Sequence, residues 1–355
     1  MFYDHFSGTA LMAAALLVVP SAAQKTSPPA TWTGKGYNVA GVGTFNSFFQ
    51  IDFSKLSDFP SSLDISTNTV GAGNSPYART FSKSNIRMNR GDSVSLLVQP
   101  KVIDGSIPSG EFSTGIDDIL YGSVRTLAKA SNVSGTCHGF FSYLDDNQET
   151  DIEILTKNLS KVWFTNQALT PGTDETSTTA SAPATIASAY HEYRIDWLED
   201  RTVFYIDGVK KAELTTNVPN KSTSWLWNNW ANGNPKWSAG PPAQISDLRI
   251  QSITAYWNRT SVAVAQPPPG NYSSSSTLTT STKTATTKSS NQPSATVKTA
   301  AKSTKSTTTT KSQTTKATTT KKSAVKKTTA KVKTTAKKAA KVKAAAKTGK
   351  PKKQA

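Results

Sequence analysis

Residues 190–209 read YHEYRIDWLEDRTVFYIDGV, and this stretch is the strongest indication of the fold class. Its runs YRIDW and VFYI are rich in β-branched and aromatic residues, which favours strands. Leu198–Arg201 can turn the chain between the two runs, and Asp207-Gly208 is a strong type I′ turn dipeptide. The stretch therefore predicts antiparallel strands joined by tight turns.

Runs of the same kind recur on both sides of this stretch, separated by Gly, Asn, Asp, Ser and Pro. The sequence shows no long amphipathic helix before its C-terminal tail, and no alternation of strands with helices. One large all-β domain over residues 24–265, a sandwich or a jelly roll, is the predicted architecture. The recurring runs are SVSLLVQ (93–99), DIEIL (151–155), VWF (162–164) and LRIQSITAYW (248–257).

The N-terminal end of the chain resembles a targeting segment. The apolar run Ala10–Val19 precedes Pro20 and small residues, so we expect residues 1–23 to be a secretory signal peptide cleaved after Ala23. The first seven residues contain no Lys or Arg, which a signal peptide usually has there. A short buried N-terminal helix is the alternative.

The positive charge of the chain belongs to its C-terminal tail, residues 266–355. The whole chain has 41 Lys and Arg, 23 Asp and Glu, and a net charge of +18. Residues 281–355 hold 21 Lys and no acidic residue, so the rest has 41 − 21 = 20 basic against 23 acidic residues, a net of −3. A tail of Ser, Thr, Ala and Lys cannot bury enough apolar surface to fold, and we expect it to be disordered.

Several partners are open for the tail. Its composition is similar to that of a linker-histone tail, but with a signal peptide we expect no nucleic-acid partner. Anionic cell-wall polymers are the expected partners, and a soluble tail that binds nothing is the alternative. We also expect a monomer without a membrane span once the signal peptide is removed.

Cysteine usage and glycosylation signals fit the secretory route. Cys137 is the only cysteine, so no intramolecular disulfide is possible. We expect a small buried apolar residue there, with an intermolecular bridge as the alternative. His138 beside Cys137 does not make a metal site, and we expect neither metal nor cofactor. With the signal peptide, five N-x-[ST] sequons predict a secreted glycoprotein, and the tail would associate it with the cell wall. The sequon asparagines are Asn132, Asn158, Asn220, Asn258 and Asn271.

The segment QETDIEILT (148–156) places three carboxylates at every second position. In a strand, Glu149, Asp151 and Glu153 would share one face, with Ile152 on the opposite, core-facing side. A row of like charges is destabilising, so a functional site is one explanation and a solvated face paired with Lys or Arg is the other. Glycoside hydrolysis uses two such carboxyl groups, one as nucleophile or base and one as acid.

The stretch GTCHGFFSYLDDNQETDIEILT (135–156) resembles the active-site strands of glycoside hydrolase family 16, its fungal secreted branch in particular. The family motif Glu-x-Asp-x-Glu is met by Glu149, Asp151 and Glu153. The hairpin of residues 190–209 and the segment WLWNNWANGNPKWSAGPP (225–242) also resemble the family, and the resemblance spans roughly residues 35–260. It implies a concanavalin A-like jelly-roll β-sandwich with the motif on a concave sheet.

The resemblance also implies roles. Glu149 would be the nucleophile, Glu153 the acid/base, and Asp151 the residue that orients and tunes them, in a retaining double displacement on β-glucan-type polysaccharides. Because sugars stack on aromatic rings, substrate-binding candidates follow from the same segments. We expect Trp197 and Trp257 in the core, and a structural role for His191. The substrate-binding candidates are Tyr143, Trp163, Asn166, Trp227, Trp230 and Trp237, with Trp230 and Trp237 the better ones.

Four functions remain open at this point. A secreted β-glucan hydrolase and a cell-wall transglycosylase would use the same triad. One residue separates Asp151 from Glu153, a regular-strand spacing that is similar to lichenases, xyloglucan-active enzymes and fungal wall-crosslinking transglycosylases. The bulged spacing is more typical of laminarinases. A non-catalytic carbohydrate-binding wall protein and a polyanion-binding protein led by its tail are the other two readings.

Overall fold

The computed structural model describes residues 26–268. The predicted signal peptide, residues 1–23, lies outside the described residues, and so does the tail beyond residue 268. The described chain is built from strands and two short 3-10 helices, η1 (Phe53–Lys55) and η2 (Lys83–Asn85). Within residues 26–268 no helix is long and apolar enough to cross a membrane.

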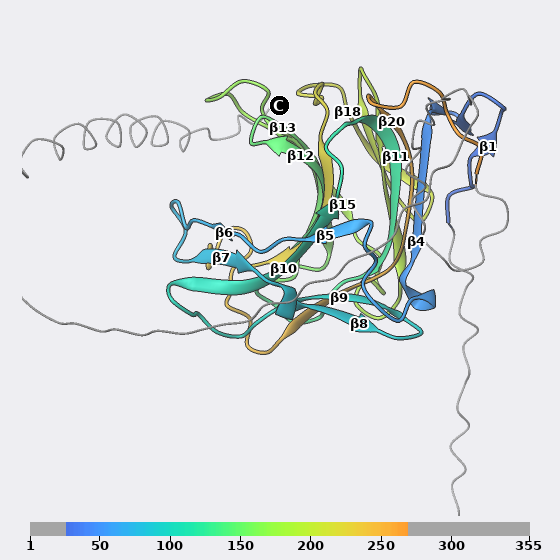
Figure 1. The fold of residues 1–355 in the computed structure, drawn as a ribbon. Helices are drawn as coiled ribbons and strands as arrows, with labels where there is room; N and C mark the ends of the chain where they lie inside the picture. The colour runs from blue at the N-terminus through green and yellow to red at the C-terminus, as the bar shows by residue number, and fades with distance from the viewer. Residues whose placement is uncertain (1–25, 269–355) are drawn as a thin grey trace, which may run out of the picture. The chain divides into compact units, whose positions relative to one another are not determined.

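One large sheet has nine strands and carries the three carboxylates. All of its pairings are antiparallel except that of β10 with β7, and a short strand, β5 (Leu63–Ile65), also pairs with β10. Figure 1 shows β12 and β13 in this layer. The strands run in the order β15 (Thr176–Ser181), β14 (Lys161–Asn166), β13 (Gln148–Leu155), β12 (Cys137–Asp145), β19 (Ser224–Trp230), β10 (Ser106–Thr114), β7 (Ala78–Phe81), β6 (Thr69–Val70).

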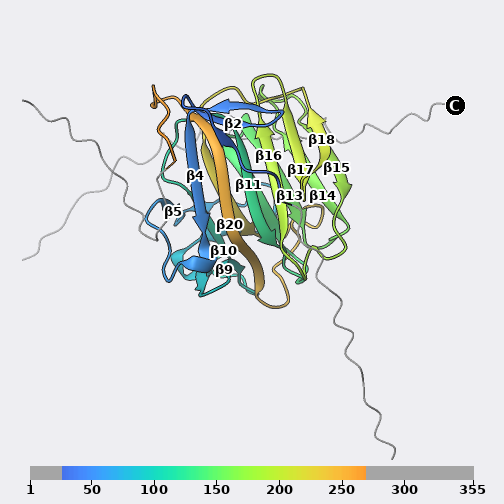
Figure 2. The same ribbon diagram turned by 90° about the vertical axis from the view of Figure 1, so that its right-hand side faces the viewer.

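The second large sheet has eight antiparallel strands and forms the other layer. Figure 2 shows its strands side by side, and β4 (Ser47–Asp52) pairs with the long strand β20. The other strands run in the order β18 (Val209–Leu214), β17 (Thr202–Ile206), β16 (His191–Trp197), β11 (Ile119–Lys129), β20 (Ser246–Arg259), β9 (Ser93–Val98), β8 (Ile86–Asn89).

A small N-terminal sheet packs against the second large sheet. It consists of β1 (Thr31–Trp32), β2 (Tyr37–Val39) and β3 (Gly43–Phe45), and its apolar side chains cluster with Tyr256 of β20. Ahead of it, the Ser27 backbone and hydroxyl both donate hydrogen bonds to the Glu192 carboxylate on β16. The N-terminal segment is therefore fixed to the outer side of the eight-stranded sheet.

The hydrophobic core draws on both large sheets. Ile152 and Ile154 of β13 pack in one cluster with Trp197 of β16 and Trp257 of β20, and all four are almost fully buried. Burying such side chains stabilises the fold by roughly 1.5–3 kcal/mol each. The predicted core positions of Trp197 and Trp257 are confirmed, and so is the all-β sandwich.

The two predicted turns are also confirmed. β16 pairs with β17 across the Leu198–Arg201 turn, and β17 pairs with β18 from Ile206 to Val209. Between them, Asp207 and Gly208 both have positive φ, 52° and 71°. This is the backbone of a type I′ turn, which matches the twist of the flanking strands.

Candidate active site

Strand β13 presents its three carboxylates on the face that is turned away from the core. Ile152 and Ile154 are fully buried in the main core cluster, so Glu149, Asp151 and Glu153 point to the opposite side, here named the free face. Pairing of β13 with β12 and β14 runs without a register shift from residue 149 to 153. The triad therefore lies on a regular, unbulged strand.

A glycine gives Glu153 room on this face. In the antiparallel pairing, Gly139 of β12 stands directly opposite Glu153, while Phe141 and Tyr143 stand opposite Asp151 and Glu149. A Cβ at Gly139 would lie 2.6 Å from Oδ1 of Asn228, the next residue in the same row. Any larger residue at Gly139 would force that amide aside.

Two donors converge on one oxygen of Glu153. The Cys137 thiol donates to Oε1 over 3.1 Å, and the Trp237 indole Nε1 donates to the same Oε1 over 3.3 Å. Cys137 is buried, as expected. The expectation of a merely apolar role is wrong, because alternation along β12 puts its thiol on the free face.

Asp151, between the two glutamates, is the most enclosed member of the triad. Its side chain is 2% exposed, and Oδ2 accepts a hydrogen bond from Gln167 Nε2 over 3.4 Å. Oδ1 is buried without a partner among the described residues. Burial, followed by the neighbouring charges of Glu153 and Glu149, raises the pKa of Asp151 well above its usual range.

The two glutamates also favour protonation. Burial, followed by the charge of Glu153, raises the pKa of Glu149 from 4.5 to about 8. Burial raises the pKa of Glu153 as well, but its hydrogen bonds from Cys137 and Trp237 oppose the shift. The guanidinium of Arg79 on β7 lowers both values. Closely spaced carboxyl groups that share one site bind protons jointly, as an acid–base pair requires.

A second group of polar residues extends along the free face from Glu153, and sequence reasoning missed it. The Asn228 amide on β19 donates to Glu111 Oε2 on β10 over 3.0 Å, and the Arg79 guanidinium lies 4.3 Å from the Trp230 ring centroid. Glu111 is 7% exposed, and burial raises its pKa. The one available sequence signal was a lone charged residue, Glu111, within the strand-like run SIPSGEFST.

Four of the predicted substrate-binding residues lie on the free face. The Trp163 and Trp237 rings are 5.0 Å apart between centroids and tilted by 58°, and both are half-buried. Trp230 is 9% exposed in the cluster that also holds Cys137. Tyr143 is half-buried, and its hydroxyl donates to Asp146 over 3.1 Å.

Two predicted substrate-binding residues are wrong. Trp227 is fully buried in the core, where its Nε1 donates to Thr126 over 2.9 Å. Asn166 is also fully buried, and its amide donates to the Thr216 carbonyl over 3.1 Å. On β14 it is Thr165, opposite Asp151, that shares the triad's face. The cause in both cases is strand alternation, which turns these side chains inward.

The remaining predicted residues lie away from the triad. His191 on the eight-stranded sheet bonds Asp207 Oδ2 over 2.7 Å, the structural role expected for it. Asn258 is half-buried, and its Oδ1 accepts from the Asn46 backbone. Asn271 lies outside the described residues. Exposed sequon asparagines are Asn132, Asn158 and Asn220.

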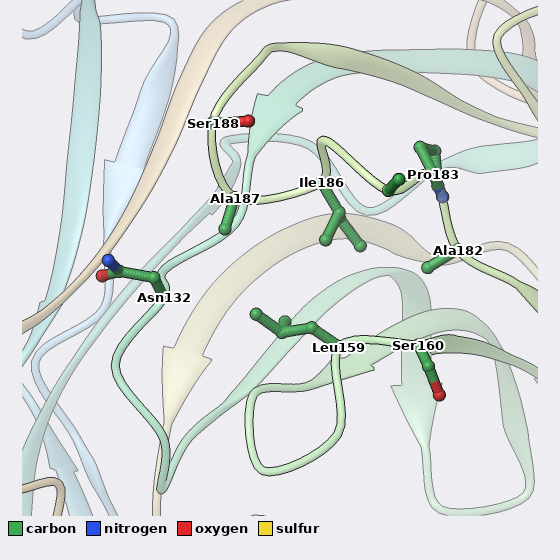
Figure 3. A pocket seen from close by; sticks show the side chains of 9 residues that line it. Asn132, Leu159, Ser160, Ala182, Pro183, Ile186, Ala187 and Ser188 are labelled. Carbon is green, nitrogen blue, oxygen red and sulfur yellow. The ribbon is translucent and has the colours of Figure 1, made fainter.

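One surface cavity lies away from the triad. It has a volume of about 610 Å³ and lies beside Leu159 and Ile186, as Figure 3 shows, with Asn132 at one side. None of the residues that line it contacts the three carboxylates through a hydrogen bond. A smaller cavity of about 300 Å³ is lined by residues of the eight-stranded sheet, among them Asp196 and Tyr205. Neither cavity carries the chemistry that the free face offers.

Comparison with known proteins finds a matching family model. Residues 73–243 match the model of the glycosyl hydrolases family 16. A β-glucanase of Bacillus amyloliquefaciens is 30% identical over 115 residues, which are 31% of this chain and 47% of that protein. The chain thus spans about half the length of this relative.

Two solved structures share the fold. A β-1,3-1,4-glucanase (lichenase) derived from a mouse hindgut metagenome has a TM-score of 0.50 at 17% identity, over 60% of this chain and 99% of the other. The β-glucanase of Bacillus licheniformis has a TM-score of 0.50 at 18% identity, over 60% and 98%. The jelly-roll architecture is therefore the one expected. Over residues 73–243 the chain is similar to glycoside hydrolase family 16.

Proposed function

We propose that the protein is a retaining endo-acting glycoside hydrolase that cleaves β-glucan-type polysaccharides. The observation that carries the proposal is the row of three carboxylates on the free face of an unbulged strand, with Glu153 held by two donors. A position of that kind has no structural advantage, because buried like charges are destabilising without a function. The β-glucanase names of relatives point to the substrate class.

In the proposed reaction Glu149 attacks the anomeric carbon while Glu153 donates a proton to the departing glycosidic oxygen. The bond from the anomeric carbon to that oxygen breaks, and a covalent glycosyl-enzyme forms on Glu149. Water then gives a proton back to Glu153 and attacks the same carbon, which frees Glu149. Asp151 lies between the two glutamates, and the rise in its pKa on burial disfavours a third negative charge in the site.

These roles require the shared proton to be on Glu153 when the sugar is bound. The hydrogen bonds of the site favour the opposite distribution, since Glu153 accepts two of them and Glu149 accepts none from the described side chains. The proposal therefore includes a proton shift toward Glu153 on binding. The pair titrates as one unit, so such a shift needs no change in the total proton count.

Covalent trapping tests the assignment. A β-glucan oligosaccharide with a fluorine at C2 of the reacting sugar and an activated leaving group should label one glutamate, because the intermediate breaks down slowly. Peptide mass spectrometry should place the label on Glu149. A label on Glu153 would reverse the two roles, and product of inverted configuration from an unlabelled enzyme would refute the double displacement.

A cell-wall transglycosylase is the second candidate, because the unbroken register of β13 through the triad is the form expected for such enzymes as well as for lichenases. The chemistry is the same, with an acceptor sugar in place of water. A panel of β-glucans with a fluorescent oligosaccharide acceptor separates the two. Shortened, unlabelled chains indicate hydrolysis, and label in large polymer indicates transfer. Tight binding without either product would favour a carbohydrate-binding protein instead.

We also propose that the protein is secreted, glycosylated and associated with the cell wall through its tail. Exposure of Asn132, Asn158 and Asn220 is compatible with glycans at these positions. Endoglycosidase treatment of protein from a secreting host should lower its mass. Removing residues 270–355 should leave catalysis unchanged and release the protein from wall material at lower salt. Equal retention of both forms would refute the anchoring role.

A further inference from the structure

The single cysteine of the chain contacts a proposed catalytic residue. Cys137 opens strand β12 opposite Leu155 and beside Trp230, and it is fully buried on the free face. It is two residues from Gly139, which faces Glu153 and has no side chain to intervene. The Glu153 carboxylate can therefore lean diagonally across to the thiol, where Sγ and Oε1 are 3.1 Å apart.

Both donors to Glu153 meet the same oxygen. Trp237 comes from the segment between β19 and β20, whereas Cys137 belongs to β12, the strand next to β13. The indole N–H and the thiol S–H therefore reach Oε1 from different parts of the chain. Oε2 of Glu153 accepts no hydrogen bond from the described residues. One oxygen is thus occupied by the protein, and the other is left for a proton or a substrate atom.

Burial keeps the Cys137 thiol in the neutral form that can donate a hydrogen bond. Burial, followed by the charge of Glu153, raises the pKa of Cys137 well above its usual range. Four charged groups act on this pair: Glu149 and Asp151 from β13, Arg79 from β7 and Glu175 near β15. Neutral Cys137 is the closest group that stabilises the ionised form of Glu153 without adding charge.

We propose that Cys137 is a positioning residue whose thiol, together with the Trp237 indole, holds Oε1 of Glu153 and so presents Oε2 to the glycosidic oxygen. The proposal rests on the hydrolase or transglycosylase function proposed above. It assigns no contact between Cys137 and the substrate. It implies that loss of the thiol slows cleavage more when the leaving group needs a proton from Glu153 than when it does not.

One readout is independent of activity. Because the chain has one cysteine, the infrared S–H stretching band of the purified protein reports Cys137 alone. We expect a band shifted to lower frequency in the wild type and returned toward that of a free thiol in Glu153→Ala. The same frequency in both proteins would overturn the proposed contact, whatever the enzyme's substrate is.

The kinetic test compares Cys137→Ala with Cys137→Ser, which keeps a donor. Cys137→Ala should lower kcat on β-glucan about tenfold, with little change in KM, and should have a much smaller effect on an aryl glycoside whose leaving group needs no proton. Since the donor favours ionised Glu153, its loss should move the alkaline limb of the kcat/KM profile to higher pH by roughly half to one pH unit. Cys137→Ser should restore most of both.

Leu155→Val provides the matched control, because Leu155 is buried opposite Cys137 on the same face and donates no hydrogen bond. It should lower thermal stability and leave the alkaline limb in place. Equal losses on both substrates in Cys137→Ala, an unmoved alkaline limb, or Cys137→Ser behaving as Cys137→Ala would refute the positioning role. Absence of glycoside cleavage by the wild type would instead refute the proposed function, and the infrared result would still stand.

Discussion

The two faces of strand β13 obey different rules although their residues alternate along eight positions. On the core face, Ile152 and Ile154 are apolar, fully buried and packed against other apolar side chains. On the free face, Asp151 is just as buried but is a carboxyl group with one oxygen unpaired. Packing explains the first face, whereas no gain in stability explains the second.

The contrast shows that the residues on the free face are explained by function, whereas those on the core face are explained by stability. Buried polar groups without partners cost about 1–3 kcal/mol each, and natural folds accept that cost mainly at functional sites. Strand β12 shows the same division, with Phe140 in the core and Cys137 on the free face bonded to Glu153. The following substitutions test whether the two faces separate activity from stability.

The largest expected effect is on the free face. Glu149→Gln and Glu153→Gln should each lower kcat by roughly 10²–10⁴-fold or more, because each removes a group that exchanges a bond or a proton with the substrate. Folding should be preserved, since an amide of similar shape replaces a buried acid. Initial rates on β-glucan measure the activity, and thermal unfolding measures the stability. Near-normal turnover in either variant would contradict the triad assignment.

Ile152→Ala makes the opposite change on the same strand, between Asp151 and Glu153. Removing a fully buried side chain should lower the free energy of unfolding by roughly 2–5 kcal/mol. The folded fraction should keep kcat within a small factor, since the free face is untouched. Denaturant titration and rates measured well below the unfolding midpoint test this, and a stability unchanged from the wild type would contradict the core assignment.

The sequence predicted that β13 has two different faces, but it did not assign every residue to the correct face. Alternation alone separated Glu149 and Glu153 from Ile152, since a strand fixes which residues share a side. It could not place Trp227, because both sides of WLWNNW contain tryptophan and only the packed sheets show which side is inward. The prediction for Asn166 was wrong because, again, only the packed sheets show which side of its strand faces inward.

The residues missed by sequence reasoning come from strands that are distant in sequence. β10 borders β19, and the Glu111 to Asn228 contact joins positions 117 residues apart. Strand order of this kind cannot be read from one sequence, because any strand-like run could be the neighbour of any other. The Cys137 contact depends in addition on Gly139, whose role appears only when the register of β12 and β13 is known.

The pH dependence of stability should also separate the faces. Burial raises the pKa of Glu149 from 4.5 to about 8, so the folded protein binds this proton more tightly than the unfolded chain does. Its contribution to stability is complete below pH 4.5 and is lost as the pH rises toward 8. Unfolding free energy measured from pH 4.5 to 8 should therefore fall more steeply in the wild type than in Glu149→Gln. Parallel curves would mean that Glu149 titrates normally.

The smallest effects come from a matched pair of Trp→Phe changes, each removing one indole N–H. Trp227→Phe breaks the bond to Thr126 in the core and should lower the free energy of unfolding by roughly 1–3 kcal/mol with kcat unchanged. Trp237→Phe breaks the bond to Glu153 and should lower kcat roughly 3–10-fold with little loss of stability, because Cys137 still holds Oε1. The pair removes the same group from each side of the sheet. If both variants lost activity and stability in the same proportion, the two faces would not be functionally distinct, and the free face would be an ordinary part of the packing.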